Sequence, residues 1–139
     1  MRKKKNNEGK VYYGKTRFID TDNKPRRRFV VTKDEDGYIS VAKVGSLKFY
    51  DKDGNNLNPA FVEIKSTYKG LTKRTGVFNR EYSKNRKTKE RLNLRKGNGV
   101  FDGKELFELD DEDFNKVDLH IKNAKTNYRK KRRKKKKGK

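Results

Sequence analysis

The stretch RRRFVVTKDEDGYISVAKV, residues 26–44, has the pattern of two β-strands joined by a tight turn. Residues 26–33 have an apolar, β-branched and aromatic centre, which favours a strand. DEDG, residues 34–37, ends in Asp-Gly, a pair that readily adopts the positive φ of hairpin turns. In residues 38–44 the alternation predicts two faces, one with Tyr38, Ser40, Ala42 and Val44 and the other with Ile39, Val41 and Lys43.

Further strand patterns lie on both sides of this hairpin. They are predicted for residues 10–18, 60–65 and 76–82, and a short strand followed by a polar loop is predicted within residues 47–59. Residues 83–99 are highly charged, and the pattern allows one short strand at residues 90–94. The chain therefore has five or more short strands in a row.

The segment LDDEDFNKVDLHIKNA, residues 109–124, predicts a helix over residues 111–125. Asp110 is a good N-cap, and Asp113 falls near the free amides of the first turn. Leu109 and Phe114 have the spacing of a hydrophobic staple. This explains the acidic cluster at residues 108–113 more simply than a cation site does, and His120 is interpreted as a surface or packing residue. The buried stripe is predicted to contain Phe114, Val117 and Ile121.

This order of elements predicts a mainly β fold with one C-terminal helix, built as a small SH3-like barrel on which the helix packs. The expected domain covers residues 10–125. A basic head, residues 1–9, and a basic tail, residues 126–139, are expected to be disordered because runs of like charge repel and stay solvated.

Charge dominates the composition. The chain has 41 Lys and Arg against 19 Asp and Glu, a net charge of +22. The head at residues 2–5 and the tail at residues 129–139 hold 14 of the basic residues, and without them 27 basic residues face 19 acidic ones, a net charge of +8. The middle of the chain is therefore basic by itself, as nucleic-acid-binding domains are.

Several classes of protein are excluded or disfavoured. The chain has no Cys, which excludes disulfides and thiolate metal sites and fits a reducing compartment, so we expect a cytoplasmic protein. A single His, His120, argues against a His-based metal site or a Ser-His-Asp triad, and we expect no cofactor. The sequence has no apolar run of membrane-spanning length, and MRKKKNNEGK lacks the apolar stretch of a secretory signal.

The basic side chains predict contacts with phosphate groups, with RNA as the expected partner and DNA as an alternative. Alternation on the first strand of the hairpin puts Arg26 and Arg28 on the same face. Tyr12, Tyr13, Phe49 and Tyr50 could stack on bases, although burial in the core is the favoured interpretation of each. The predicted phosphate-contacting residues are Arg26, Arg28, Lys43, Lys48, Lys73, Arg74, Arg129, Lys130, Lys131, Arg132 and Arg133.

The ordered set of these segments resembles the PemK/MazF-like family of bacterial toxin-antitoxin modules, over residues 11–121. The segments that carry the resemblance are VYYGK (11–15), RRRFVV (26–31), ISVAKVGS (39–46), PAFVEI (59–64), GLTKRTGVFNRE (70–81) and LDDEDFNKVDLHI (109–121). The resemblance implies a homodimer of SH3-like barrels that binds single-stranded RNA, and an acidic antitoxin as a partner. In active members it implies a metal-independent endoribonuclease with an Arg and a Thr or Ser near the scissile phosphate.

Carried over to this chain, the two catalytic positions fall on Arg26 and, with a shift of one residue from Gly45, on Ser46. An Arg suits stabilisation of a phosphorane because its planar fork holds two oxygens, and a Ser hydroxyl supplies one more hydrogen bond. Arg27 stands where the family has a Pro. Three functions stay open: a toxin-type endoribonuclease, a non-catalytic nucleic-acid-binding accessory protein of a plasmid, phage or mobile element, and a structural or ribosome-associated RNA-binding protein.

Overall fold

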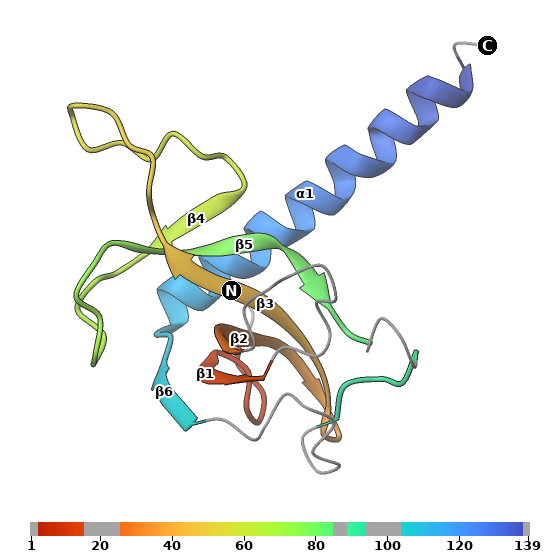
Figure 1. The fold of residues 1–139 in the computed structure, drawn as a ribbon. Helices are drawn as coiled ribbons and strands as arrows, with labels where there is room; N and C mark the ends of the chain where they lie inside the picture. Colours follow the sequence, from red (N-terminus) through yellow and green to blue (C-terminus); the bar gives the residue numbers. More distant parts are fainter. Residues whose placement is uncertain (1–2, 16–25, 85–88, 94–103, 138–139) are drawn as a thin grey trace.

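The computed structural model describes residues 3–15, 26–84, 89–93 and 104–137 and, within these ranges, all side chains except those of residues 15, 26 and 129–137. The chain forms a strongly curved sheet with one long helix beside it (Figure 1). The elements are β1 (Lys10–Lys15), β2 (Arg26–Glu35), β3 (Tyr38–Ser46), β4 (Phe61–Ile64), β5 (Thr75–Tyr82), β6 (Lys104–Glu108) and α1 (Asp111–Lys137).

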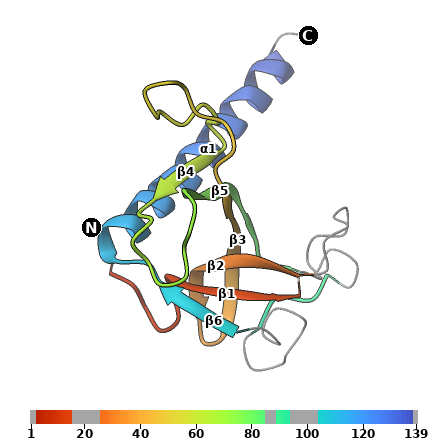
Figure 2. The same cartoon turned by 60° about the vertical axis from the view of Figure 1, so that its left-hand side comes forward.

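The six strands form one antiparallel sheet in the order β4-β5-β3-β2-β1-β6, so the prediction of a mainly β fold with a single C-terminal helix is confirmed. The β2–β3 hairpin lies at its centre, and its turn has the predicted positive φ at Asp36 (54°) and Gly37 (87°). The sheet bends so that β1, β2 and β6 cross the direction of β3 (Figure 2). Among the described strands, β4 and β6 are the two edges and do not pair with each other.

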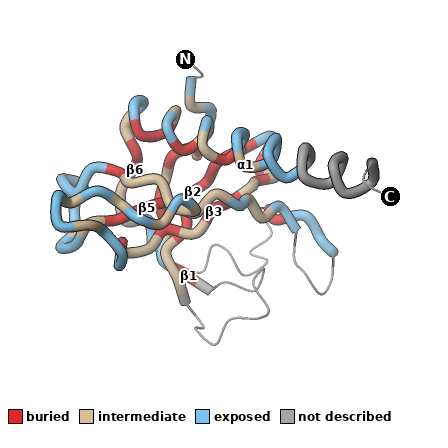
Figure 3. The backbone as a smooth tube through the Cα atoms, turned by 90° about the horizontal axis from the view of Figure 1, so that it is seen from above, coloured by how far each residue is buried: buried red, intermediate tan, exposed pale blue. Residues whose placement is uncertain are grey.

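Both faces of the sheet are covered, as the alternation in β3 predicts. Ala42 and Val44 belong to a core cluster between the sheet and α1, together with Val30 of β2. Ile39 and Val41 belong to a second cluster on the opposite face, where Leu92 from the segment after β5 covers them. The red core in Figure 3 therefore follows the central strands and the inner side of the first turns of α1.

The helix begins as predicted. The Asp113 amide donates to the Asp110 carboxylate at 2.8 Å, which is the expected N-cap hydrogen bond. Leu109 is buried in the cluster under the helix, and the predicted stripe is buried with it, namely Phe114, Val117 and Ile121. His120 packs with its Nε2 3.2 Å from the Ala60 carbonyl oxygen, as expected for a packing residue.

The helix does not end near residue 125 as predicted but continues to Lys137 and projects away from the sheet (Figure 1). Lys and Arg have good intrinsic helix propensity, and lengthening an existing helix is far less costly than nucleating one. These effects outweigh the repulsion between like charges, which is small for each pair on a solvated helix. Charge repulsion alone therefore did not predict the helical backbone conformation of residues 126–137.

The basic head also differs from the expected disorder, because residues 3–9 pack against the sheet. Gly9 donates its amide to the Val31 carbonyl oxygen, and buried Glu8 accepts the amide of Asp34 at 3.2 Å. Lys4 reaches the Leu109 carbonyl oxygen at 2.6 Å and also Glu108 at 3.0 Å. The head therefore packs through the Gly9 amide, the Glu8 carboxylate and the Lys4 ammonium, each of which has a hydrogen-bond partner on the domain.

The strands differ from the prediction in three places. β6 was not predicted, because its sequence KELFE has only two apolar residues, and its pairing with β1 comes from tertiary contact. Residues 47–59 form an irregular loop with one isolated bridge, Tyr50 to Asn56, and no strand. Residues 90–93 form isolated bridges instead of a strand, and residues 16–18 and 94 of the predicted strands lie outside the described residues.

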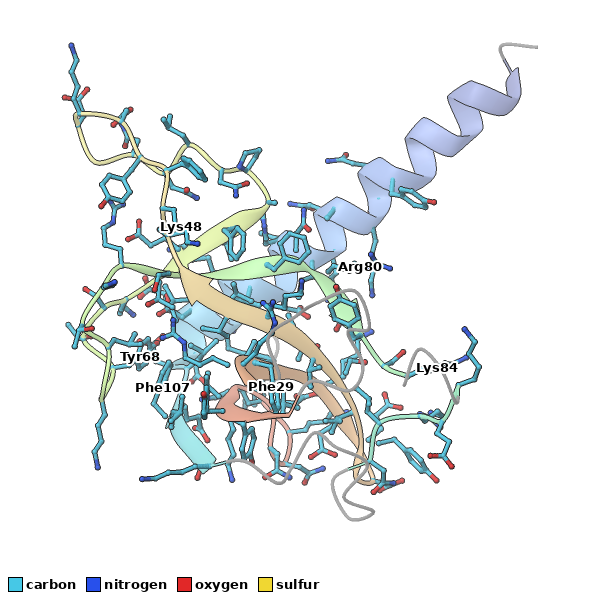
Figure 4. The ribbon with its side chains drawn as sticks, in the orientation of Figure 1. Phe29, Lys48, Tyr68, Arg80, Lys84 and Phe107 are labelled. Carbon is cyan, nitrogen blue, oxygen red and sulfur yellow. The ribbon has the colours of Figure 1, made fainter. Side chains whose placement is uncertain are left out.

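The start of α1 is anchored to the loop after β4 by a buried polar contact. The Tyr68 hydroxyl donates to Asp113 Oδ2 at 2.7 Å, and the Lys65 amide donates to the same oxygen at 3.0 Å. The Tyr68 ring stacks on Phe107 of β6 with centroids 5.0 Å apart. Both residues are labelled near the start of α1 in Figure 4. Burial, and then the hydrogen bond to Asp113, raise the pKa of Tyr68, so its hydroxyl remains a donor at neutral pH.

Further along, α1 is held to β5 through the half-buried Glu81. Its carboxylate accepts hydrogen bonds from Lys125 of the helix and from Thr32 of β2, the latter at 2.5 Å. Burial raises the pKa of Glu81, but the hydrogen bonds from Lys125 and Thr32 outweigh burial and hold the pKa below its usual value. The charged carboxylate is therefore favoured in the folded state.

This lowered pKa predicts an acid-dependent loss of stability. The contribution of Glu81 is fully present above its unfolded pKa of about 4.3 and is lost as the pH falls through the lower folded value. As the pH is lowered from about 5 to 3, the free energy of unfolding of Glu81→Gln should fall less than that of the wild type. Urea unfolding at each pH measures both. Glu35→Gln, which removes an exposed carboxylate of β2, is the control. Parallel pH profiles for the wild type and Glu81→Gln would contradict the prediction.

In the part of the chain that the structure describes, no helix has both the length and the apolar character needed to cross a membrane.

Candidate nucleic-acid-binding groove

A groove of about 490 Å³ lies at one end of the sheet, where β2 begins and β3 ends. The register places Tyr13 of β1 opposite Arg28 of β2, and Arg28 opposite Val44 of β3. Opposed residues in an antiparallel pair share a face, so the strand pairing itself gathers these side chains. We call this cavity the sheet-end groove, and its polar and aromatic lining includes Tyr13, Arg27, Arg28, Ser46, Lys48 and Phe49.

Close packing of β3 on β5 sets the position of Ser46 in the groove. Ser46 is the last residue of β3 and pairs with Thr75, next to the pair formed by Gly45 and Gly76. A Cβ on Gly76 would lie 2.8 Å from Leu47 and 3.1 Å from the Val62 carbonyl oxygen, so this position requires glycine. The chain leaves the sheet directly after Ser46, which turns the following residues into the groove wall.

Arg28 and Ser46 meet inside the groove. The Arg28 guanidinium donates from Nη2 to Ser46 Oγ over 3.5 Å, a long contact between two half-buried side chains. A guanidinium carries five N–H donors in a fixed fork, so it can bind a phosphate while it contacts the hydroxyl. The arginine that contacts Ser46 is thus Arg28, which was predicted as a phosphate-contacting residue and not as the catalytic arginine.

Arg26, the predicted catalytic arginine, begins β2 with its backbone paired to Lys15. Its side chain lies outside the described residues, so its catalytic role stays a prediction. Lys48 lines the sheet-end groove and is exposed (labelled in Figure 4), and its contact with phosphate stays a prediction. Of the predicted set, the structure thus brings Arg28, Ser46 and Lys48 together.

Arg74 is placed differently from the prediction, because it makes an internal ion pair. Its Nε and Nη2 donate to the two oxygens of Glu63 at 2.7 and 2.6 Å, and its guanidinium lies 4.8 Å from the ring centroid of Tyr50. The hydrogen bond from Arg74 lowers the pKa of Glu63 and keeps this pair charged. Arg74 thus orders the loop of Tyr50, and Lys73 beside it is exposed in the segment before β5.

Two other parts of the predicted set lie away from the groove. Lys43 is on the opposite face of β3, level with Phe29 of β2. The basic residues of the tail are in the helical backbone of α1, and their side chains lie outside the described residues; they are Arg129, Lys130, Lys131, Arg132 and Arg133.

The aromatic residues divide between core and surface. Tyr12 packs on Phe29 with ring centroids 6.0 Å apart, which confirms its expected place against the core. Phe49, Tyr50 and Tyr13 were expected in the core but are 64%, 50% and 44% exposed. For Phe49 and Tyr50 the reason is that β3 ends at Ser46, so residues 47–50 no longer alternate between two buried faces. Tyr13 is on β1 opposite Arg28, where the face of the sheet opens into the groove. Phe49 and Tyr13 line the sheet-end groove.

This arrangement combines two binding chemistries in one cavity. Arg28 and Lys48 offer charged donors for phosphate oxygens, and the exposed ring of Phe49 offers a flat apolar face on which a base can stack. Among the described residues that line the groove, none is a carboxylate or a histidine that could act as a general base. The residues described by the structure also contain no cluster of His, Cys, Asp or Glu suited to a metal ion.

Comparison with known proteins returns no matching family model and no matching curated protein. The resemblance to the PemK/MazF-like family therefore stays a hypothesis from sequence segments. The evidence on function therefore comes from the side chains that line the sheet-end groove.

Proposed function

We propose that this protein binds single-stranded nucleic acid, with RNA as the first candidate, in the sheet-end groove. The observation that carries the proposal is the convergence of Arg28, Lys48 and the exposed Phe49 ring on one cavity of about 490 Å³. That volume lies within the range of pockets for small organic ligands and suits a nucleotide. The net charge of +22 adds a long-range attraction for a polyanion.

An unpaired strand fits this groove better than a duplex does. In a duplex, the faces of the bases are stacked on one another and cannot reach Phe49. A single strand can turn one base outward, stack it on the ring and leave its phosphate beside Arg28 and Lys48. The proposal therefore includes a preference for single strands.

We expect Arg28→Ala to weaken binding of a fluorescein-labelled 12-nucleotide single-stranded RNA by about 10- to 100-fold, the scale of a lost charge-assisted hydrogen bond. Phe49→Ala should weaken it by about 5- to 100-fold through lost stacking. Anisotropy titrations at fixed salt measure both. Lys69→Gln, which removes one exposed charge from the loop before β5, is the control and should change affinity little.

Binding of double-stranded RNA as tight as that of the single strand would contradict the proposal, as would unchanged affinity in both groove variants. Equal affinity for single-stranded DNA of the same sequence would leave the groove as the proposed binding site but would contradict the preference for RNA. A cytoplasmic location is part of the proposal, and the absence of Cys from the sequence is what favours it.

A second candidate function is metal-independent endoribonuclease activity, and the Arg28–Ser46 contact is the observation that favours it. An RNA 2′-hydroxyl could attack the adjacent phosphate and break its bond to the 5′-oxygen of the next nucleotide, which leaves a 2′,3′-cyclic phosphate, while Arg28, together with the predicted Arg26, stabilises the phosphorane. The hydroxyl proton would pass through water, and the 5′-oxygen would leave as a hydroxyl. The groove's described lining lacks a general base, so the geometry supports binding better than cleavage. The homodimer and the acidic antitoxin implied by the family resemblance belong to this second candidate.

Incubation of the pure protein with a mixed RNA pool in EDTA separates the two candidates. Fragments that disappear in both Arg28→Ala and Ser46→Ala would support the enzyme. Intact RNA after prolonged incubation, together with tight binding, would leave the protein as a non-catalytic binder.

A further inference from the structure

A second basic and aromatic surface lies on the face of the sheet opposite α1. On β5, alternation places Phe78, Arg80 and Tyr82 on this face. Lys43 of β3 joins them, because a register shift between β3 and β5 leaves Lys43 facing the bulged part of β5. We call the set the β5 strip, and its members are Phe61, Phe78, Lys43, Tyr82 and Arg80.

Each member of the β5 strip contacts the next one along the surface. The Phe61 and Phe78 rings lie 5.3 Å apart between centroids, tilted by 47°. The Lys43 ammonium lies 5.4 Å from the Phe78 centroid and 6.0 Å from that of Tyr82. The Arg80 guanidinium lies 5.3 Å from the Tyr82 centroid. The strip therefore combines three flat rings with two cations, which is the composition of surfaces that bind single strands.

The charges on the strip are of one sign. Partial burial, and then the positive charges of Arg27 and Arg80, lower the pKa of Lys43 below its usual value. Three cations close together on a partly desolvated surface repel one another, and a bound anion would relieve this repulsion. Charge complementarity therefore points to a polyanionic occupant rather than to an apolar one.

The β5 strip is continuous with the sheet-end groove at one end. Arg27 and Phe61 line the groove, and Phe61 is also the first member of the strip. At the other end, Arg80 also lines a second cavity of about 520 Å³, which lies on the α1 side of β5 and is lined as well by Glu81 of β5 and by Lys125 and Tyr128 of α1. The pairing of β4 with β5 ends at Phe78, so the path reaches this cavity round the outer edge of β5 at Arg80. Figure 4 shows Lys48 toward β4 and Arg80 beside the helix, so the path crosses the sheet from one to the other.

We propose that a single strand bound in the sheet-end groove continues across the β5 strip to the cavity beside α1, with Lys43 and Arg80 on its phosphates and Phe78 or Tyr82 against a base. The proposal rests on the proposed function and adds that the occupant is a strand of several nucleotides. Such a strand leaves the sheet beside α1, the helix that carries the basic tail.

The test is a length series of labelled oligouridylates of 2, 4, 8 and 12 nucleotides, titrated by anisotropy. For the wild type, affinity should keep rising with strand length after the strand has become longer than the groove alone can hold. The Lys43→Gln/Arg80→Gln variant should bind the 12-nucleotide strand at least about tenfold more weakly, with a salt slope lower by about 0.7 for each lost phosphate contact. It should bind the 2-nucleotide strand like the wild type.

A control variant, Lys69→Gln/Lys116→Gln, removes two exposed charges, one from the loop before β5 and one from the first turns of α1 on the other face of the sheet, and should match the wild type at every length. Arg80 is exposed, so Arg80→Gln alone is a second variant that keeps the fold if the double variant unfolds. Photocrosslinking of a 4-thiouridine strand should label Phe78 or Tyr82 in the wild type, as located by mass spectrometry.

Different results separate this inference from the proposed function. Unchanged binding of the 12-nucleotide strand in the double variant, with Arg28→Ala still weakened, would overturn the β5 strip and leave the groove intact. Equal weakening of short and long strands would also overturn the proposed path. No binding of any oligonucleotide by the wild type would overturn both.

Discussion

Deletion of residues 129–139 is expected to weaken the binding of single-stranded nucleic acid by at least about a hundredfold at low salt, because ten basic residues are lost at once. The attraction of these residues for the phosphate backbone comes from the release of counterions and does not depend on base sequence. The slope of log affinity against log salt should therefore flatten by several units, on the scale of about 0.7 per lost phosphate contact.

The same deletion should leave the melting temperature within about two degrees, because the core residues of α1 end at Ile121 and Lys125 makes the described ion pair of α1 with β5, both before the deleted residues. A salt titration of anisotropy on the full-length and shortened proteins measures the slopes. A second variant with residues 129–137 all replaced by Gln keeps a good helix former and removes the charge, so it separates charge from helix length. Equal slopes for all three proteins would show that the tail makes no contact with the nucleic acid.

Phe114→Ala is expected to destabilise the protein by about 3 kcal/mol or more, the usual cost of truncating a buried Phe. Phe114 is almost fully buried in the cluster that joins α1 to the sheet, beside Leu109. Removing its ring leaves a cavity at the point where the helix begins, and a rigid sheet cannot collapse to fill it. Urea unfolding monitored by circular dichroism gives the change in free energy.

Leu119→Ala is the matched control, since Leu119 is on the same helix but 59% exposed. It should change stability by less than about 0.5 kcal/mol. A melting temperature of Phe114→Ala equal to that of the wild type would mean that α1 does not hold to the sheet through this face.

The predictions from sequence were confirmed for features that depend on interactions between residues a few positions apart. The Asp36–Gly37 turn follows from the φ preferences of two neighbouring residues, and the N-cap of α1 follows from one side chain and an amide three residues away. The alternation in β3 depends on strand geometry alone. These features need no knowledge of the rest of the chain.

The site depended on partners that are distant in sequence. Arg74 looked like a free cation until the fold put Glu63 beside it, and Phe49 looked like a core residue until β3 was seen to end at Ser46. Nothing in the neighbourhood of Lys43 reveals that β5 will place Phe78 and Arg80 on the same face. Each of these outcomes is set by strand register over tens of residues, which a local pattern does not contain.

The sequence by itself determined a mainly β chain closed by an N-capped helix, with a strong positive charge, because turn, cap, alternation and charge depend on residue types within a few positions. Tertiary structure decided that β6 forms, that the head packs, and that Arg28, Ser46, Lys48 and Phe49 share one cavity. The physical reason is that the register of β2 on β1 and on β3, and the pairing of β3 with the distant strand β5, set which side chains meet at the end of the sheet, and these partners lie up to tens of residues apart in the chain.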